Sequence, residues 1–322
     1  MAHTVTFGLA DMRPVFPMEP IQSLQIPVGE EWTASVKWDG VRILTYYDGH
    51  ETALLNRKQH LRTMHYPELA DAAQYCQAKS IILDGEVIAL DAQNKPSFHD
   101  VMRRDGIRRQ GLVPTRAKEV PIVYMVFDIL FYNGKSVTEL PFQRRMDILF
   151  ASLRTSPTVQ AVPNYPDGEA LFDVVKRHQL EGIVVKLGHS AYVCGERHSD
   201  WRKIKNYRDI IAVVGGYTAV GDVPNALLLG LPDRDEHLYY VATVGPGKLA
   251  RTEWAQLHHT LYEHRVEKCP FERPPAPSRQ VVWTKPRIAV KVQFIEWTKD
   301  SSLRQPTLQA VVDAPPDEHP FA

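Results

Sequence analysis

The sequence has few cysteines, no long apolar run and no net charge. Its three cysteines, Cys76, Cys194 and Cys269, form no Cys-x-x-Cys pair, which argues against a disulfide scaffold and a zinc knuckle. We therefore expect a reducing, cytoplasmic setting. The most apolar stretch, 122–132, is too short to span a membrane and contains Asp128, and the first residues do not resemble a signal peptide. We expect no contact with a membrane.

Charge is balanced over the whole chain but uneven along it. The 322 residues include 38 Lys and Arg and 38 Asp and Glu, so the net charge does not indicate a nucleic-acid partner. Two stretches are nevertheless basic, 103–118 and 197–208. Such clusters occur on solvated surfaces and in phosphate-binding sites, and both interpretations stay open here.

The first two thirds of the chain alternate predicted strands with predicted helices. Helices are predicted over 143–154 and 168–178, with Asp167 as N-cap of the second. Strands are predicted over 33–36, 41–47, 81–83, 87–90, 124–131 and 183–185. This pattern indicates an α+β domain with substantial antiparallel sheet, which we place at 1–206.

After residue 206 the predicted strands become shorter and lie closer together. They are expected at 210–214, 226–229, 238–244, 281–283 and 290–294. One helix, predicted over 252–264, separates the third strand from the fourth. Five strands with a helix at that point is the layout of an OB-type barrel, so we place a second domain at 207–322.

One lysine has the surroundings of a nucleophile. Lys37 begins the string Lys-x-Asp-Gly-x-Arg between two predicted strands, and Asp39 and Gly40 form the expected turn between them. The amine must lose a proton before it can attack, and a metal ion or a second cation nearby would lower its pKa. The alternative is a surface hairpin that carries an ordinary lysine.

Further residues follow Lys37 in an order that suits nucleotidyl transfer. Glu86, between two predicted strands, and Glu181, at the start of another, are either Mg²⁺ ligands or solvated strand ends. Lys203 and Lys205 alternate along a strand, so they share a face that either neutralises an α-phosphate or is solvated. Phe127 fits a base-stacking platform and plain core equally well.

Taken together, these residues resemble the motifs of the covalent nucleotidyltransferases. The closest resemblance is to the ATP-dependent DNA ligases, and within them to the ligase module of the bacterial end-joining ligase D. The motifs are, in chain order, Lys37-x-Asp39-Gly40-x-Arg42, Asn56-Arg57, Asp84-Gly85-Glu86, Phe127-Asp128, Glu181 to Lys186, and Trp201-x-Lys203-x-Lys205. The ligase D pattern adds Tyr192, Gly195, Arg197 and Ser199, then Val292-x-Phe294-x-Glu296-Trp297 and Leu303-Arg304-Gln305-Pro306-Thr307.

The resemblance implies a reaction in three steps. Lys37 attacks the α-phosphate of ATP and expels pyrophosphate, which leaves a lysyl-AMP phosphoramidate. The AMP then moves to the 5′-phosphate at a nick, and the adjacent 3′-hydroxyl displaces it to seal the strand. Positioning and charge neutralisation supply most of the catalysis in such displacements. The implied fold is an adenylation domain with antiparallel sheets, followed by an OB-fold DNA-binding domain.

The same resemblance implies a role for each matched residue. The catalytic group is Lys37, Asp39, Lys203 and Lys205. The nucleotide is expected to contact Val36, Lys37, Arg42, Arg57, Glu86, Phe127, Lys186, Lys203 and Lys205, with Arg42 and Glu86 at the ribose and Phe127 at the adenine. The ligands of Mg²⁺ or Mn²⁺ are expected to be Glu181 and Glu86, and the DNA contacts Arg197, Arg202 and Arg304.

Two positions depart from the family pattern. Ser35 stands where a glutamate commonly helps to read adenine. The last motif normally continues to an arginine and a lysine that orient the leaving pyrophosphate, and this chain has Val312 and Pro315 in that segment. Later steps release no pyrophosphate, so we expect slow self-adenylylation with near-normal sealing of pre-adenylylated DNA.

Other functions share parts of the pattern. An RNA ligase or a capping guanylyltransferase would carry the same lysine motif, although the ligase D-like C-terminal signature argues against both. A non-catalytic clamp that binds nicks or ends would explain the altered last motif. An NAD⁺-dependent ligase is disfavoured by the lack of zinc-ligand cysteines.

The expected substrate is nicked double-stranded DNA, bound by a monomeric, bacterial-type enzyme. No separate DNA-binding domain precedes Lys37 in this sequence, so we expect a modest and salt-sensitive grip on DNA. An end-bridging protein or a repair polymerase is the expected partner for recruitment.

Overall fold

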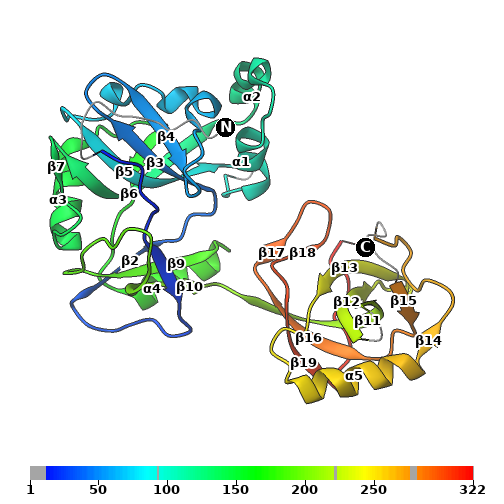
Figure 1. Ribbon diagram of the computed structural model, residues 1–322. Coiled ribbons are helices and arrows are strands. Elements are labelled where there is room, and N and C mark those ends of the chain that lie inside the picture. The colour runs from blue at the N-terminus through cyan, green and yellow to red at the C-terminus, as the bar shows by residue number, and fades with distance from the viewer. Residues whose placement is uncertain (1–11, 93, 221–222, 276–280, 322) are drawn as a thin grey trace. The chain divides into compact units, whose positions relative to one another are not determined.

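The computed structural model describes residues 12–92, 94–220, 223–275 and 281–321 (Figure 1). The chain divides into two compact units, Met1–Asn206, called unit 1, and Tyr207–Ala322, called unit 2. Each unit has its own apolar core.

The larger sheet of unit 1 has the strand order β4-β3-β5-β6-β7, with β8 paired in parallel to β6. Its strands are β3 (Val41–Tyr47), β4 (Thr52–Asn56), β5 (Ile81–Ala89), β6 (Ile122–Tyr132), β7 (Lys135–Ser136) and β8 (Val159–Ala161). Successive side chains of a strand point to opposite faces, and here both faces are apolar. Ile43 and Leu83 enter one core cluster, whereas Leu44 and Ile82 enter another. The sheet is therefore covered on both sides.

Helices cover the face of the larger sheet that carries Ile43 and Leu83. They are α1 (Phe98–Asp105), α2 (Val113–Glu119) and α3 (Phe142–Ser152), with short 3₁₀ turns η1 (Thr63–His65), η2 (Pro67–Leu69), η3 (Ala72–Gln74) and η4 (Gln110–Leu112). Val101 of α1 and Phe142 and Leu149 of α3 are at most 1% exposed in the cluster that includes Ile43 and Leu83. These contacts anchor the sheet that carries Arg42 and Glu86.

A second sheet of unit 1 has the order β1-β10-β9-β2. Its strands are β1 (Glu19–Gln22), β2 (Trp32–Val36), β9 (Gly182–Leu187) and β10 (Arg197–Lys205), and α4 (Gly168–Arg177) packs against it. Trp201 of β10 belongs to the cluster on the second face of the larger sheet, with Tyr46 and Phe131. The two sheets therefore meet through that cluster.

Unit 2 is built around the long strand β11 (Arg208–Val220). Its start pairs with β16, its end pairs with β15, and β12 pairs along its other edge, so one strand serves several neighbours. The remaining elements are β12 (Val223–Pro232), β13 (Leu238–Val244), α5 (Arg251–Glu263), β14 (Arg265–Val266), β15 (Val281–Thr284), β16 (Ala289–Phe294), β17 (Glu296–Trp297), β18 (Leu303–Arg304) and β19 (Thr307–Val312). Leu257 and Leu261 place α5 against the core of this barrel (Figure 1).

The predicted helices are confirmed, and one capping prediction with them. The helices predicted over 143–154, 168–178 and 252–264 are α3, α4 and α5, each shifted by at most two residues at either end. The Asp167 side chain accepts a hydrogen bond from the Ala170 amide at 2.9 Å, as an N-cap does.

Two local predictions around the site are wrong. The strands on either side of Asp39 and Gly40 do not pair with each other, because β2 pairs with β9 and β3 pairs with β4 and β5. The two residues therefore connect two sheets rather than close a hairpin. Glu86 was expected between two strands but lies inside the continuous strand β5.

In unit 2 most strands are longer than predicted, β13 has the predicted bounds, and three further strands, β17, β18 and β19, follow the last predicted one. The last-motif segment that lacks the family's two cations forms β19, which pairs with β16. Val312 ends this strand opposite Ala289. The barrel therefore uses the altered motif as a structural strand.

Candidate active site

Strand pairing brings the predicted nucleophile to residues that are far from it in the sequence. The Lys37 amide donates a hydrogen bond to the Gly182 carbonyl at 2.9 Å, just after β2 ends beside β9. Lys205 of β10 lies opposite Gly182 on the other edge of β9. A Cβ atom on Gly182 would lie 2.2 Å from the Ile204 carbonyl oxygen, so glycine is required for this close approach. Glu181 directly precedes Gly182 and so sits between the two lysines.

The Glu181 carboxylate joins both lysines. Its Oε2 lies 2.6 Å from Lys37 Nζ, and its Oε1 lies 3.6 Å from Lys205 Nζ. The Glu181 side chain is 5% exposed and that of Lys37 is 23% exposed, so the pair is sheltered while the amine still reaches solvent. Burial, followed by the charges of Lys205 and Lys37, lowers the pKa of Lys203. Three lysines and one carboxylate therefore form a compact group with excess positive charge.

The second predicted carboxylate lies on the larger sheet. Glu86 of β5 is directly opposite Arg42 of β3. Burial raises the pKa of Glu86 to about 8, although the charges of Lys37 and Arg42 act in the opposite direction and that of Glu181 adds to the rise. Glu86 therefore belongs to the same electrostatic group as Lys37, and it holds a proton at neutral pH.

Arg42 has partners that the sequence did not assign to it. Its Nε and Nη2 donate to the two oxygens of Asp84 at 2.9 Å and 2.6 Å, which is a bidentate pair. The Tyr192 hydroxyl donates to Asp84 at 2.6 Å and accepts from Arg42 at 3.2 Å. Asp84 is fully buried. Asp84 lies two residues before Glu86, on the same face of β5, and this spacing within the Asp84-Gly85-Glu86 motif was its sequence signal.

Phe127 and Lys186 contact each other next to Arg42. Lys186 Nζ donates to the Phe127 carbonyl at 3.0 Å and lies 4.8 Å from the Phe127 ring centroid and 3.9 Å from that of Trp201. Burial lowers the pKa of Lys186 to about 7, against the charge of Asp128 at 4.0 Å. Phe127 is half-buried, and the Arg42 guanidinium lies 5.3 Å from its centroid. The ring therefore has cations beside it and one part open to solvent.

Ser35, Val36 and Asp39 lie within two residues of Lys37 in the sequence. Val36 ends β2 opposite Ile183, and Asp39 contributes to the electrostatic field at Glu86. The Ser35 side chain is buried and bonds the Val184 carbonyl at 3.4 Å. This position therefore offers a nucleotide no carboxylate.

The predicted nucleotide contact Arg57 and the predicted DNA contacts Arg197, Arg202 and Arg304 all have partners within the protein. Arg57 and Arg197 both pair with Glu19, at 3.3 Å and 3.2 Å. The Arg202 guanidinium lies 4.9 Å from the Trp32 ring centroid. In unit 2, Arg304 pairs with Glu296 at 2.7 Å.

Three arginines of the basic stretch 103–118 have structural partners. Arg104 is fully buried and donates to both oxygens of Glu68 at 2.9 Å. Arg103 and Arg116 both pair with Glu119. The phosphate-binding interpretation of this stretch is therefore not supported at these three arginines.

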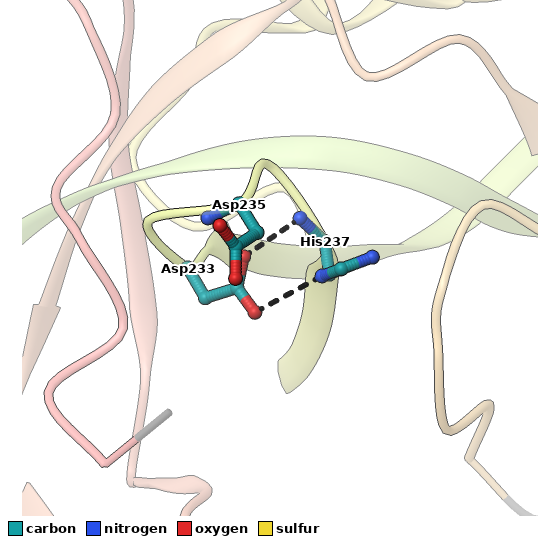
Figure 2. Close-up of side chains that lie close together, drawn as sticks. All are labelled: Asp233, Asp235 and His237. Atoms are coloured by element: carbon teal, nitrogen blue, oxygen red, sulfur yellow. Dashed lines mark hydrogen bonds and ion pairs between the residues drawn. The ribbon is translucent and has the colours of Figure 1, made fainter.

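A cluster of possible metal ligands in unit 2 is also explained by its local structure. Asp233, Asp235 and His237 lie together in the turn between β12 and β13 (Figure 2). Asp233 Oδ1 accepts from the amides of Asp235 at 2.9 Å and His237 at 2.8 Å, and Oδ2 lies 3.3 Å from the His237 ring. The aspartate thus closes the turn.

Among the helices of the described residues, none has both the length and the apolar character needed to span a membrane.

Two known family profiles match this chain, one in each unit. The profile of the ATP dependent DNA ligase domain matches residues 18–205, and that of the ATP dependent DNA ligase C terminal region matches residues 221–313. The first match contains every unit 1 residue discussed above as a nucleotide or metal contact. Both profiles fit the expected fold class, an adenylation domain followed by an OB-fold barrel, and that prediction is confirmed.

Individual relatives agree with the profiles. The multifunctional non-homologous end joining protein LigD of Mycolicibacterium smegmatis is 29% identical over 300 residues, which cover 90% of this chain and 37% of that protein. The multifunctional non-homologous end joining DNA repair protein LigD of Mycobacterium tuberculosis is 28% identical over 284 residues, covering 85% of this chain and 35% of the relative. The chain therefore spans little more than a third of the length of these relatives.

Solved structures give the same result. Mycobacterial DNA ligase D complexed with ATP and MES matches with a TM-score of 0.52 and 26% identity, over 95% of this chain and 96% of that chain. A Lig E DNA ligase matches in fold, with a TM-score of 0.59 at 18% identity over 94% of this chain and all of that one. On these grounds, the chain belongs to the ATP-dependent DNA ligases, enzymes that join DNA strands by forming phosphodiester bonds.

Proposed function

We propose that this chain seals nicks in duplex DNA through a covalent AMP adduct on Lys37. The observation that carries the proposal is the Lys37–Glu181–Lys205 group. These residues lie at the ends of three adjacent strands, β2, β9 and β10, on the same side of the sheet. A lysine that is sheltered, next to other cations and still partly exposed has the properties of an activated amine nucleophile.

The first chemical step uses the lysines of this group. After Lys37 Nζ loses a proton, its lone pair forms a bond to the α-phosphorus of ATP, and the bond from that phosphorus to pyrophosphate breaks. Lys203 and Lys205 neutralise charge on the phosphate oxygens as the reaction proceeds. Lys37 must leave its ion pair with Glu181 before it attacks, so nucleotide binding and release of this carboxylate are coupled.

Glu181 and Glu86 are suited to hold Mg²⁺ or Mn²⁺, because both supply hard carboxylate oxygens beside Lys37. When bound, such an ion stabilises negative charge on phosphate oxygens and lowers the pKa of a neighbouring amine. Glu86 must give up its proton to act as a ligand, and the nearby cation favours that loss.

The nucleoside part of ATP is assigned to Phe127, Arg42 and Glu86. Phe127 stacks on the adenine, and Arg42 and Glu86 hold the ribose. Arg42 is kept in place by its bidentate pair with Asp84, which costs no rearrangement on binding. Val36 and Asp39 complete the strand end and connection that carry the nucleophile, and Lys186 supports the Phe127 backbone from the buried side.

DNA phosphates are assigned to three arginines. Arg197, Arg202 and Arg304 are guanidinium groups that can bind phosphate in bidentate fashion. Arg57, which the sequence motifs place with the nucleotide, shares Glu19 with Arg197, and this supports a phosphate contact for both. Because the relatives are end-joining proteins by name, we further propose a role in double-strand break repair, with an end-bridging protein or a repair polymerase as partner.

Intact mass spectrometry tests the central proposal. Incubation with ATP and Mg²⁺ is expected to add one AMP to the protein, and a nicked duplex is expected to remove it and become sealed. Lys37→Ala abolishes both events, whereas Lys176→Ala, an exposed lysine of α4 paired with Asp173, leaves both intact. If wild type gains no AMP but seals pre-adenylylated nicks, the first step is defective. If it does neither yet binds nicks, the chain is a non-catalytic clamp.

A further inference from the structure

One carboxylate stands among the arginines assigned to DNA. Glu19 belongs to β1, which runs parallel to β10, and in that register Glu19 lies beside Arg197. Its amide donates to the Glu196 carbonyl at 2.8 Å, so the backbone fixes its position. Its Oε1 lies 3.3 Å from Arg57 Nη1, and its Oε2 lies 3.2 Å from Arg197 Nη2.

The side chains around Glu19 are open to solvent. Arg57 is 60% exposed and Arg197 is 66% exposed, whereas Glu19 between them is 27% exposed. Two guanidiniums that each take one oxygen of the same anion form the arrangement with which arginines bind phosphate. Glu19 therefore occupies the position that a phosphate group would take between these two arginines.

Glu19 is charged under working conditions. Burial acts to raise its pKa, but the hydrogen bond from Arg197 and the charges of Arg57, Arg197 and Arg42 outweigh this and hold the pKa below its ordinary value. Glu19 also acts on the active-site group, because it opposes the lowering of the pKa of Lys203. Its negative charge thus lies at the boundary between the arginine pair and the catalytic lysines.

We propose that Glu19 is an internal competitor for DNA: it occupies the phosphate site of Arg57 and Arg197 in the free enzyme and must be displaced when duplex binds. This inference rests on the proposed function, since it assumes that both arginines contact DNA phosphate. Displacement costs two partly exposed ion pairs, each of modest value. The displaced carboxylate also takes up a cation from solution, which offsets part of the counterion release that drives DNA binding.

The test is the affinity of the full chain for a short, fluorescent nicked duplex, measured by anisotropy in EDTA without ATP, so that no chemistry follows binding. Glu19→Gln is expected to lower Kd by about three- to tenfold, because the neutral amide leaves the arginines free for phosphate. The slope of log affinity against log salt is expected to steepen by about one. Arg57→Gln in the Glu19→Gln protein should remove most of the gain.

The matched control is Asp147→Asn. Asp147 is 64% exposed and pairs with Arg144 on α3, so the change in charge is the same, but the site is not. It should leave Kd and the salt slope unchanged. An unchanged or weaker affinity for Glu19→Gln, or an equal gain for Asp147→Asn, overturns the proposal. Adenylylation and sealing by wild type are measured separately, so failure of the ligase assignment is distinguishable from failure of the Glu19 assignment.

Discussion

The two units use charged side chains differently. In unit 1, Lys37, Lys205 and Glu181 form a sheltered group in which one carboxylate serves two cations. In unit 2, the described ion pairs are mostly single and solvated, as in Arg234 with Glu318. Sheltered groups with unequal charge perturb protonation and hold substrates, whereas solvated pairs contribute little. The contrast supports the proposal that unit 1 carries the chemistry of the first step and that unit 2 contributes through its surface.

The largest expected effect comes from removing the shared carboxylate. Glu181→Gln keeps the side-chain volume but leaves Lys37 and Lys205 without their counter-charge and removes a proposed metal ligand. We expect self-adenylylation, followed by intact mass over time, to slow by about 10²- to 10³-fold. Glu318→Gln, the matched change in unit 2, should alter the rate less than about twofold. Similar losses in both variants would contradict the division of labour between the units.

The second effect tests the altered last motif. Val312→Arg with Pro315→Lys restores two cations to a segment where the family orients pyrophosphate, and Pro315 is exposed. We expect self-adenylylation to rise by about tenfold, because charge neutralisation of the leaving group is specific to that step. Sealing of pre-adenylylated nicks should stay within about twofold of wild type.

Val311→Arg is the control for this pair. Val311 is the neighbouring residue of β19, so its side chain points to the opposite face of the strand. A gain from Val311→Arg as large as that from the pair would mean that added positive charge alone is responsible. Equal changes in adenylylation and sealing would remove the role of the last motif in the first step.

The sequence predicted the local parts of this site better than its assembly. The Lys37 string, the helices and the Asp167 cap are local patterns, and the structure contains them. The strand that pairs with β2 is β9, well over a hundred residues later, and no local signal chooses that partner over β3. A turn was therefore predicted where the chain crosses between sheets, and Asp84 was given no role. Pairing over such separations depends on tertiary packing, which periodicity does not encode.

A third, smaller effect is expected from unit 2. Arg304 is paired with Glu296 on β17 and β18 and is assigned to a DNA phosphate. Arg304→Ala should raise Kd for nicked duplex by about three- to tenfold and make the salt slope shallower by about one. Arg234→Ala removes another arginine of unit 2 that is paired with an acid, and it should change neither quantity. If both variants weaken binding equally, the effect is the net charge of the unit rather than a contact.

The smallest effect is a difference in pH response between the units. The folded pKa of Glu86, about 8, lies above its unfolded value, so folded protein keeps a proton that unfolded protein releases. The stability from this group is therefore complete below about pH 4.5 and is lost as pH rises through about 8. Burial lowers the pKa of His319 in unit 2, so its contribution is present above about pH 6.5 and is lost as pH falls.

Calorimetry of the full chain from pH 5 to about pH 8.5 separates the two groups. Relative to wild type, Glu86→Gln should gain thermal stability as pH rises, because the amide has no proton to lose. His319→Gln should gain as pH falls, because unfolded wild type takes up a proton that the buried ring of the folded protein resists. Parallel curves for all three proteins would mean that neither group titrates differently in the folded chain, and the protonated state assigned to Glu86 before nucleotide binding would be wrong.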